Sequence, residues 1–210
     1  MKKKSKYERY FKRIFDFIFS VVLLVSLSPI ILAVSLLILI LVGRPVIFKQ
    51  NRPGKGNKIF TMYKFRTMKS TKDRNGYLLP DKDRMTKVGK FLRSTSIDEL
   101  PELINVLVGD MSFVGPRPLL VKYLDYYTTD ELARHSVRPG ITGLSQVNGR
   151  NNLGWDERLN LDVKYVRKIT LKEDTIILVK TIFKVIKKDN VIIDGNYKFL
   201  NLDDERKNNE

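Results

Sequence analysis

The hydrophobic pattern of this chain is dominated by one apolar segment near the N-terminus. Residues 17–42 contain no charged side chain, and 20 of these 26 positions are Leu, Ile, Val or Phe. A helix on the surface of a soluble protein is apolar along one stripe, whereas this segment is apolar on all sides. At roughly 0.3 to 0.6 kcal/mol per apolar residue, its transfer into a bilayer is favourable by about 6 to 12 kcal/mol. The pattern therefore predicts a membrane helix over residues 14–43.

A secretory signal peptide is the alternative interpretation of this segment, because lysines precede it. The apolar run is longer than the core of a signal peptide, and no cleavage site of small residues follows it. We therefore favour the membrane helix.

A proline interrupts the apolar segment near its centre. Pro29 follows Ser28, and a proline inside a helix removes one backbone hydrogen bond and kinks or breaks the helix. A re-entrant helix that turns at Ser28 and Pro29 returns to the face of the bilayer that it entered. A single kinked span remains the other possibility.

The charges beside the apolar segment favour the re-entrant path. Residues 1–13 hold seven basic residues and one acid, and residues 43–76 hold ten basic residues and one acid. Basic flanks stay on the cytoplasmic face, and only a re-entrant helix keeps both of them there. Where the chain enters the membrane, Asp16 could pair with Lys12 or Arg13 and anchor the helix at the interface. The alternative interpretation is a solvated ion pair that anchors nothing.

The net charge of +16 is concentrated in those two flanks, because the remaining 134 residues outside the apolar segment hold 22 basic and 20 acidic side chains. This distribution argues against a nucleic-acid partner bound by the whole fold. It favours an anionic phospholipid bilayer, to which each nearby Lys or Arg contributes on the order of 1 kcal/mol.

The rest of the sequence predicts a mainly helical α+β fold. Two β-prone runs, residues 46–50 and 59–65, flank a turn-rich basic loop and predict a hairpin. Capping-box spacing predicts helix starts at Ser96 and Thr170, and the second of these helices is cationic and amphipathic, as for a helix at a membrane interface. Residues 138–143 are predicted as loop, and the chain from residue 203 as disordered. We expect four segments: a basic N-terminal segment (1–13), the membrane helix (14–43), a compact cytoplasmic catalytic domain (44–190) and a tail (191–210).

Composition limits the chemistry that this domain can perform. The chain has no cysteine, which excludes disulfides and thiol catalysis, and its one histidine, His135, is interpreted as a surface residue. Carboxylates, Arg, Lys, backbone amides and a hard cation remain. Asp98 and Glu99 either complement a helix dipole or, because Pro101 distorts their turn, form a Mg²⁺ and phosphate site near Arg93.

Two further segments carry groups suited to phosphate. Arg117 lies between two prolines, so its guanidinium is presented at small entropic cost, either to a phosphate or to solvent. The glycine-containing segment from residue 138 to residue 150 contains amides and cations that suit a nucleotide diphosphate, and these are Arg138, Gln146, Asn148 and Arg150.

Taken together and in order, these motifs resemble the bacterial sugar transferases, the monotopic phosphoglycosyl transferases. The resemblance covers about residues 9–188, and Ser145 departs from it mildly, because members commonly have alanine there. The motifs that carry it are Lys12-Arg13-x-x-Asp16, Ser28-Pro29, Lys64-Phe65-Arg66-Thr67-Met68, Ser96-Ile97-Asp98-Glu99-Leu100-Pro101, the run from Gly109 to Pro118, and the run from Arg138 to Arg150.

The resemblance implies transfer of a sugar 1-phosphate from a UDP-sugar to polyprenyl (undecaprenyl) phosphate, with release of UMP. It implies that Asp98 is the nucleophile, that Glu99 and Mg²⁺ assist and that Arg93 contacts phosphate. It also implies the minimal catalytic form of the family, at the cytoplasmic face of a bacterial cytoplasmic membrane, in the first membrane step of capsule, exopolysaccharide or glycoprotein glycan assembly.

Two other functions stay open from the sequence. One is a membrane-anchored basic module that binds lipid or nucleic acid without catalysis. The other is a transferase in which the lipid phosphate attacks directly and Asp98 is only a metal ligand. The sugar and the oligomeric state cannot be read from these motifs.

Overall fold

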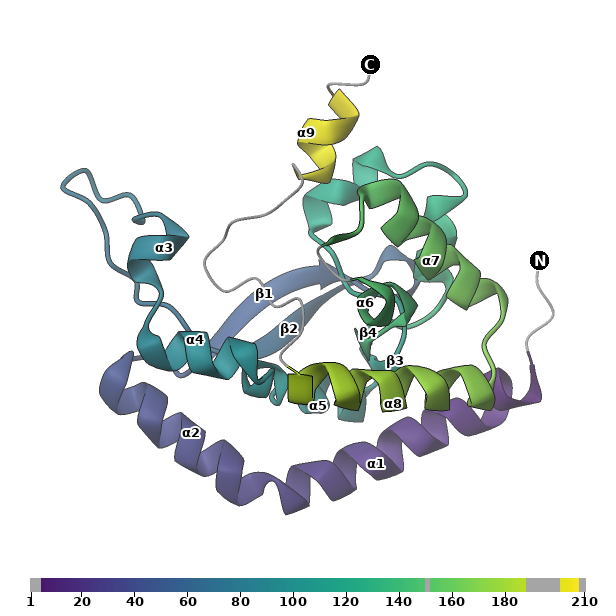
Figure 1. The fold of residues 1–210 in the computed structure, drawn as a ribbon, viewed down its shortest axis with the longest axis horizontal. Helices are drawn as coiled ribbons and strands as arrows, with labels where there is room; N and C mark the ends of the chain where they lie inside the picture. The colour runs from purple at the N-terminus through teal and green to yellow at the C-terminus, as the bar shows by residue number, and fades with distance from the viewer. Residues whose placement is uncertain (1–4, 150–151, 188–200, 208–210) are drawn as a thin grey trace.

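The computed structural model describes residues 5–149, 152–187 and 201–207 (Figure 1). Its strands are β1 (Ile47–Pro53), β2 (Ile59–Phe65), β3 (Ser112–Val114) and β4 (Gly140–Thr142). Its α-helices are α1 (Lys12–Ser26), α2 (Ser28–Leu41), α3 (Asp81–Arg84), α4 (Lys87–Ser94), α5 (Glu102–Val108), α6 (Leu144–Asn148), α7 (Trp155–Arg167), α8 (Leu171–Lys187) and α9 (Leu202–Lys207). Shorter helical turns lie at Tyr7–Phe11, Ile97–Glu99, Val121–Tyr126 and Glu131–Ser136.

The predicted mainly helical α+β fold and its hairpin are confirmed. Strands β1 and β2 pair antiparallel, with Ile47 opposite Phe65 and Pro53 opposite Ile59. The pairing extends three residues beyond the strand expected at 46–50, because Arg52 and Pro53 still lie in the ladder and only residues 54–58 form the turn.

The predicted loop at residues 138–143 is wrong, because it contains strand β4. This strand pairs in parallel with β3, with Ser112 opposite Gly140 and Val114 opposite Thr142. A Cβ atom at Gly140 would lie 2.1 Å from the backbone nitrogen of Gly115, so only glycine permits this approach. A pairing between segments so far apart in sequence leaves no periodic signal in either of them.

The apolar segment forms two helices, as the proline predicted. Helices α1 and α2 meet at Leu27 with a bend of 62°. The bend places Pro29 in the first turn of α2, where its missing N–H costs no helical hydrogen bond, and Ser28 Oγ donates to the Val25 carbonyl at 2.8 Å. Among the described residues, no single helix is long and apolar enough to cross a membrane, whereas the bent pair together meets the criteria of length and composition.

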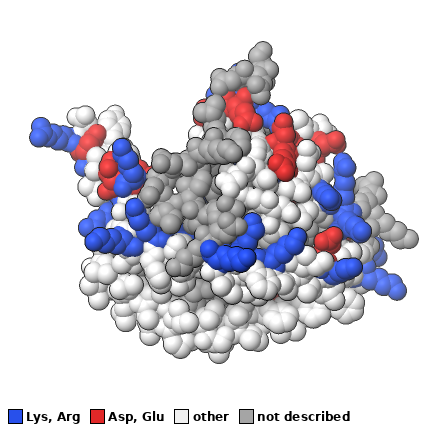
Figure 2. All heavy atoms as spheres, viewed as in Figure 1, with Lys and Arg blue, Asp and Glu red and all other residues white. Residues whose placement is uncertain are grey.

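Helix α1 has its polarity reversed relative to a helix of a soluble protein, whereas α2 buries Val34 and Ile38. The buried residues of α1 are Asp16 and Ser20, whereas apolar side chains such as Val25 (69 % exposed) and Ile40 (78 % exposed) point away from the protein. In Figure 1 the pair runs beneath the rest of the fold, and its lower surface in Figure 2 shows neither acidic nor basic side chains.

The predicted pairing of Asp16 with Lys12 or Arg13 is not formed, because each side chain has a partner in a later part of the chain. Asp16 accepts a hydrogen bond from the Phe113 backbone N–H at 3.1 Å, and Lys12 pairs with Asp174 of α8. Arg13 donates to the Val106 and Leu107 carbonyls at the C-terminal end of α5. The helix dipole favours a cation at this end. The three residues therefore hold the helix pair against the domain.

Two apolar clusters hold the elements around the site. Helices α6, α7 and α8 enclose Val147, Tyr165 and Ile177 beside β3. A second cluster joins α7 to the chain after β3 and to α9. The Thr170 cap is confirmed, because its hydroxyl accepts the Glu173 N–H at 3.2 Å.

Three other sequence predictions change in the structure. Residues 202–207 form helix α9 rather than a disordered tail, because Leu202 is fully buried. His135 is buried beside Tyr127 rather than exposed, and burial followed by the Arg134 charge lowers its pKa to about 3. The expected boundary near residue 190 lies outside the described residues.

Candidate active site

The turn that carries the two acids has a conformation that its proline requires. Ser96 has a positive φ of 56° and does not cap a helix through its side chain, so the predicted capping box is wrong. A single 3₁₀ turn, Ile97–Glu99, follows, and α5 begins only after Pro101, whose ring cannot be accommodated inside a helix. The expected distortion at Pro101 is confirmed.

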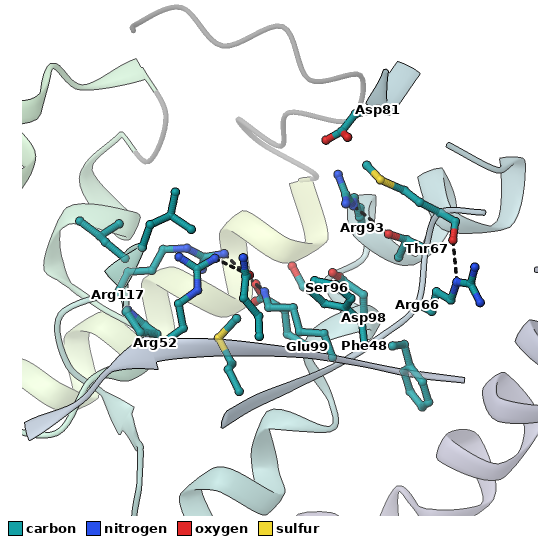
Figure 3. A pocket seen from close by; sticks show the side chains of 18 of the residues that line it. Phe48, Arg52, Arg66, Thr67, Asp81, Arg93, Ser96, Asp98, Glu99 and Arg117 are labelled. Atoms are coloured by element: carbon teal, nitrogen blue, oxygen red, sulfur yellow. Dashed lines mark hydrogen bonds and ion pairs between the residues drawn. The ribbon is translucent and has the colours of Figure 1, made fainter. Parts of the chain in front are cut away.

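This turn lies on one wall of a cavity of about 690 Å³ (Figure 3). Proteins bind drug-sized ligands in cavities of about 300 to 1,000 Å³. Among the described lining residues, eight side chains are Lys or Arg and four are Asp or Glu. The cavity therefore suits an anionic ligand of nucleotide size.

Glu99 is held as a carboxylate by two cations. Its Oε1 accepts from Lys64 Nζ at 2.7 Å and from Arg117 Nη2 at 3.0 Å. Burial by itself would raise the pKa of Glu99, but Lys64 and Arg117 outweigh burial and hold this pKa well below its usual value. Lys64 also lies 3.1 Å from Glu102, whose pKa burial raises to about 7.

Asp98 has a different environment from its neighbour. Only 9 % of the residue is exposed, and among the described residues its carboxylate accepts no hydrogen bond. Burial first, and then the charge of Glu99, raise the pKa of Asp98 to about 6. A buried carboxylate with unused lone pairs at a cavity wall is available to a cation or an electrophile.

Arg93 reaches the same cavity from helix α4. Its Nε donates to Thr67 Oγ1 at 3.1 Å, and it lies close enough to Asp98 to lower the pKa of that carboxyl. Helix α4 packs closely against the chain that follows strand β2, because Gly89 has no side chain. A Cβ atom at Gly89 would lie 1.9 Å from the Thr67 carbonyl oxygen. Figure 3 shows Arg93 and Arg117 on opposite sides of the acidic pair.

A buried ion pair supports the segment that carries Arg117. Arg134 and Asp162 are both about 1 % exposed and pair at 2.8 Å. The same Nη2 atom of Arg134 that pairs with Asp162 also donates to the Arg117 carbonyl at 2.7 Å. Ser145, the residue that departs from the family pattern, donates to Asp162 Oδ1 at 2.8 Å, so the departure adds a hydrogen bond to this network.

The structure brings together some of the predicted site residues and separates others. Asp98, Glu99, Arg93, Arg117 and Gln146 all line the cavity. The other predicted phosphate-binding residues either do not line the cavity or lie outside the described part of the chain.

Arg138 and Asn148 do not line the cavity, contrary to expectation. Arg138 donates to the Gly109 carbonyl at 2.6 Å, because it precedes β4 on the side that faces the end of α5. Asn148 follows Gln146 by two positions in α6, so the helical rotation of about 200° directs it to the exposed side, where it donates to the Leu144 carbonyl. Arg150 lies outside the described residues.

Sequence reasoning did not identify Lys64, Glu102, Asp162 or Arg134 as part of the site. Lys64 had a weak signal, since it belongs to the Lys-Phe-Arg-Thr-Met motif and is a charged residue in a strand between two aromatic residues. For the others no local signal exists, because their roles depend on contacts across the fold.

The sequence is similar to those of known sugar transferases. A model of the bacterial sugar transferase family matches residues 7–188. The chain is 49 % identical over 180 residues to the uncharacterized sugar transferase EpsL of Bacillus subtilis, covering 86 % of this chain and 89 % of that protein. It is 37 % identical over 198 residues to an undecaprenyl-phosphate galactose phosphotransferase of Salmonella typhimurium, covering 86 % of this chain and 41 % of that protein.

A third relative is covered over most of its length. The chain is 37 % identical over 190 residues to a UDP-glucose:undecaprenyl-phosphate glucose-1-phosphate transferase of Caulobacter vibrioides, with coverage of 85 % of this chain and 71 % of that protein. The chain therefore belongs to the bacterial sugar transferase family, as its motifs predicted, and these names support the enzyme class of a phosphoglycosyl transferase.

Proposed function

We propose that this protein transfers a sugar 1-phosphate from a UDP-sugar to undecaprenyl phosphate through a covalent intermediate on Asp98. The observation that carries the proposal is the contrast between two adjacent acids in one cationic cavity. Glu99 is bound by Lys64 and Arg117, whereas Asp98 accepts no hydrogen bond from any described residue. Asp98 is therefore the acid whose two carboxylate oxygens are both available, whereas Glu99 is engaged by two cations through Oε1.

The first step forms one bond and breaks one. An Asp98 carboxylate oxygen attacks the β-phosphorus of the UDP-sugar, and the bond from that phosphorus to the bridging oxygen breaks, so that UMP leaves with the electron pair. In the second step a phosphate oxygen of undecaprenyl phosphate attacks the same phosphorus, which regenerates the carboxylate and yields undecaprenyl-diphosphate-sugar.

Cationic side chains lower the cost of bringing an anionic nucleophile to an anionic diphosphate. Arg93 and Arg117 flank the acids in the cavity. Positive groups fixed in a partly buried site stabilise the charge that develops in the transition state without reorganising. Arg117 is itself held by Glu99, so its guanidinium keeps a defined position.

A magnesium ion fits this donor set if the substrate supplies part of its coordination. Among the described residues, no three His, Asp or Glu side chains are grouped as for a metal held by protein alone. Asp98 has unused lone pairs, and Glu99 Oε2 accepts no hydrogen bond from a described residue, so these two would hold the ion. When bound, Mg²⁺ would offset the charge of the diphosphate, and it commonly binds through one or two carboxylates plus substrate phosphates.

The helix pair supports a re-entrant position in one leaflet of the cytoplasmic membrane. Its outward side chains are mostly apolar, its buried polar residues Asp16 and Ser20 face the domain, and it bends by 62°. Lys and Arg side chains lie in a band above the uncharged lower surface in Figure 2, as expected beside anionic headgroups. Such an anchor would keep the cavity on the cytoplasmic side, near the phosphate of the lipid acceptor.

A trapping experiment tests the covalent step. Purified protein in lipid nanodiscs is incubated with Mg²⁺ and UDP-glucose or UDP-galactose labelled in the sugar, without undecaprenyl phosphate, and quenched in acid. We expect label on the protein chain in the wild type and in Asp110→Asn, whose acid is exposed at the end of α5. We expect none in Asp98→Asn, which keeps the size of the side chain.

Two results would change the proposal. If wild-type protein releases UMP with undecaprenyl phosphate present but never carries label, direct attack by the lipid phosphate replaces the covalent route. If no UDP-sugar in a panel of glucose, galactose and their N-acetylated forms gives UMP, the transferase proposal itself is wrong and a binding module becomes the better interpretation.

A further inference from the structure

The segment at helix α9 reaches the cavity through Asn201, the residue that precedes the helix. Asn201 is one of the lining residues of the cavity, together with Tyr123 and Trp155. Tyr123 OH donates to Asn201 Oδ1 at 3.2 Å. In Figure 1 α9 lies beyond the end of α7, on the side of the fold opposite the helix pair.

This helix is fixed on the domain by apolar and ionic contacts. Leu202 is fully buried in a cluster with Leu119, Tyr123 and Leu159. Three ion pairs surround this contact: Lys122 with Asp203 at 2.6 Å, and Arg206 with Glu131 at 2.7 Å and with Asp156 at 2.8 Å. Burial of Leu202 stabilises the docked helix, and the ion pairs on its sides fix its orientation.

The docked helix lies outside the part of the chain that the family shares. The family model ends at residue 188, whereas Asn201 and α9 follow it. The catalytic acids and Arg117 lie within the shared region. A cavity wall made by residues outside that region can alter which donor binds without altering the phosphoryl-transfer chemistry.

Asn201 retains hydrogen-bonding capacity after its contacts with the described residues. Its Nδ2 donates one hydrogen bond to Asp204 at 3.1 Å, and its Oδ1 accepts one from Tyr123. A carboxamide has two N–H donors and two acceptor lone pairs, so one donor and one lone pair have no partner among the described residues. This pattern suits hydroxyl or amide groups, as in a sugar or a pyrimidine base, rather than a phosphate.

We propose that Asn201, held in place by the docking of Leu202, binds the neutral part of the nucleotide-sugar donor and so determines donor selection by this enzyme. The inference rests on the proposed function for the identity of the donor. It goes beyond that function because it assigns binding to a segment that lies outside the family match.

The chain offers an intrinsic probe for this site. Trp155 is the single tryptophan, it lines the cavity, and its ring centroid lies 5.4 Å from that of Tyr123. Its fluorescence therefore reports on ligands in this part of the cavity. Titrations of full-length protein with UDP and with UDP-glucose or UDP-galactose are made in the Asp98→Asn background, where no turnover occurs.

We expect Asn201→Ala to raise the Kd of the UDP-sugar roughly 3- to 10-fold, the loss typical of one hydrogen bond. Leu202→Ala is expected to raise it at least as much, because Asn201 loses its support. The matched control is Glu205→Gln in the same helix, whose side chain makes no ion pair with a described residue, and its Kd should not change. With Asp98 intact, Asn201→Ala should raise KM for the donor and leave kcat unchanged.

A comparison of UDP with the UDP-sugar shows which part of the donor Asn201 contacts. An equal loss for UDP and UDP-sugar supports binding to the nucleoside, and a loss for UDP-sugar alone supports binding to the sugar. An unchanged Kd in both Asn201→Ala and Leu202→Ala, with folding confirmed by circular dichroism, overturns the inference. Release of UMP by wild-type protein is measured separately, so a failure of the proposed function is not confused with this result.

Discussion

Lys64 Nζ lies 2.7 Å from Oε1 of Glu99, so a residue of the β-hairpin determines the ionisation of the acid beside the proposed nucleophile. The ammonium group also pairs with Glu102 at 3.1 Å. Burial opposes the charge of Lys64, but Glu102 and Glu99 outweigh burial and raise its pKa. One buried cation thus compensates two buried acids.

Removal of this cation should reduce both stability and activity. Lys64→Met keeps the length of the side chain but removes the cation that pairs with Glu102. Breaking a buried ion pair typically costs about 3 to 5 kcal/mol of folding free energy. Urea unfolding followed by Trp155 fluorescence measures the loss, and UMP release measures activity.

Lys69→Met is the matched control for that variant. Lys69 lines the same cavity but forms no ion pair with a described residue. Its removal should change stability by less than about 0.5 kcal/mol. Equal destabilisation by both substitutions would contradict the role assigned to Lys64.

Neutralisation of Asp98 should stabilise the protein at neutral and alkaline pH. The pKa of Asp98 in the folded protein is about 6 against an ordinary value of 3.8, so ionisation is disfavoured by folding. This destabilisation is fully present above pH 6 and disappears as the pH falls from 6 towards 3.8. In magnesium-free buffer at pH 8, Asp98→Asn should therefore be more stable than wild type by on the order of 2 kcal/mol.

Thermal unfolding of both proteins between pH 4.5 and pH 8 tests this dependence. The difference in Tm should shrink towards the acid end. A constant difference across the range would mean that Asp98 is not a destabilised carboxylate. Added Mg²⁺ should narrow the difference at pH 8 if it binds the ionised acid.

The buried Arg134 should be required to position Arg117. Arg134→Met leaves Asp162 as an unpaired charge that is about 1 % exposed, and we expect a loss of about 3 to 5 kcal/mol in the free energy of unfolding. The exposed Arg167→Met in α7 serves as control. Because Arg134 also donates to the Arg117 carbonyl, the variant should bind UDP more weakly by Trp155 fluorescence even where it remains folded.

Both ends of the helix pair should be accessible from the same side of the membrane. The chain has no cysteine, so single cysteines at Lys6 and Lys58, both exposed, can be labelled selectively. In intact cells a membrane-impermeant maleimide should label neither, and in inverted vesicles it should label both. Labelling of one site from outside the cell would establish a full span instead of a re-entrant helix.

Local patterns predicted the elements whose cause is local. The hairpin, the break at Pro29, the distortion at Pro101 and the Thr170 cap were all recognisable, since each depends on a few neighbouring residues. Strand β4 and helix α9 were not recognised. Both depend on surfaces supplied by distant segments, namely β3 and the cluster around Leu202.

The residues predicted for the candidate site also fall into two groups, those that line the cavity and those that do not. Asp98, Glu99, Arg93 and Arg117 were predicted from motifs and do line one cavity, whereas Arg138 and Asn148 point elsewhere. A motif states which residues are close along the chain. It does not state which side of a short strand or helix each side chain occupies.

By itself the sequence determined the family, the apolar segment with its break, and the pair of acids that carry the proposed chemistry. Only the tertiary structure decided that the two acids differ, because Lys64 and Arg117 approach Glu99 and leave Asp98 without a partner among the described residues. It also decided that Lys12, Arg13 and Asp16 bind the domain, and that Asn201 reaches the cavity. The physical reason is that pKa, burial and access depend on distances across the fold, which adjacent residues do not specify.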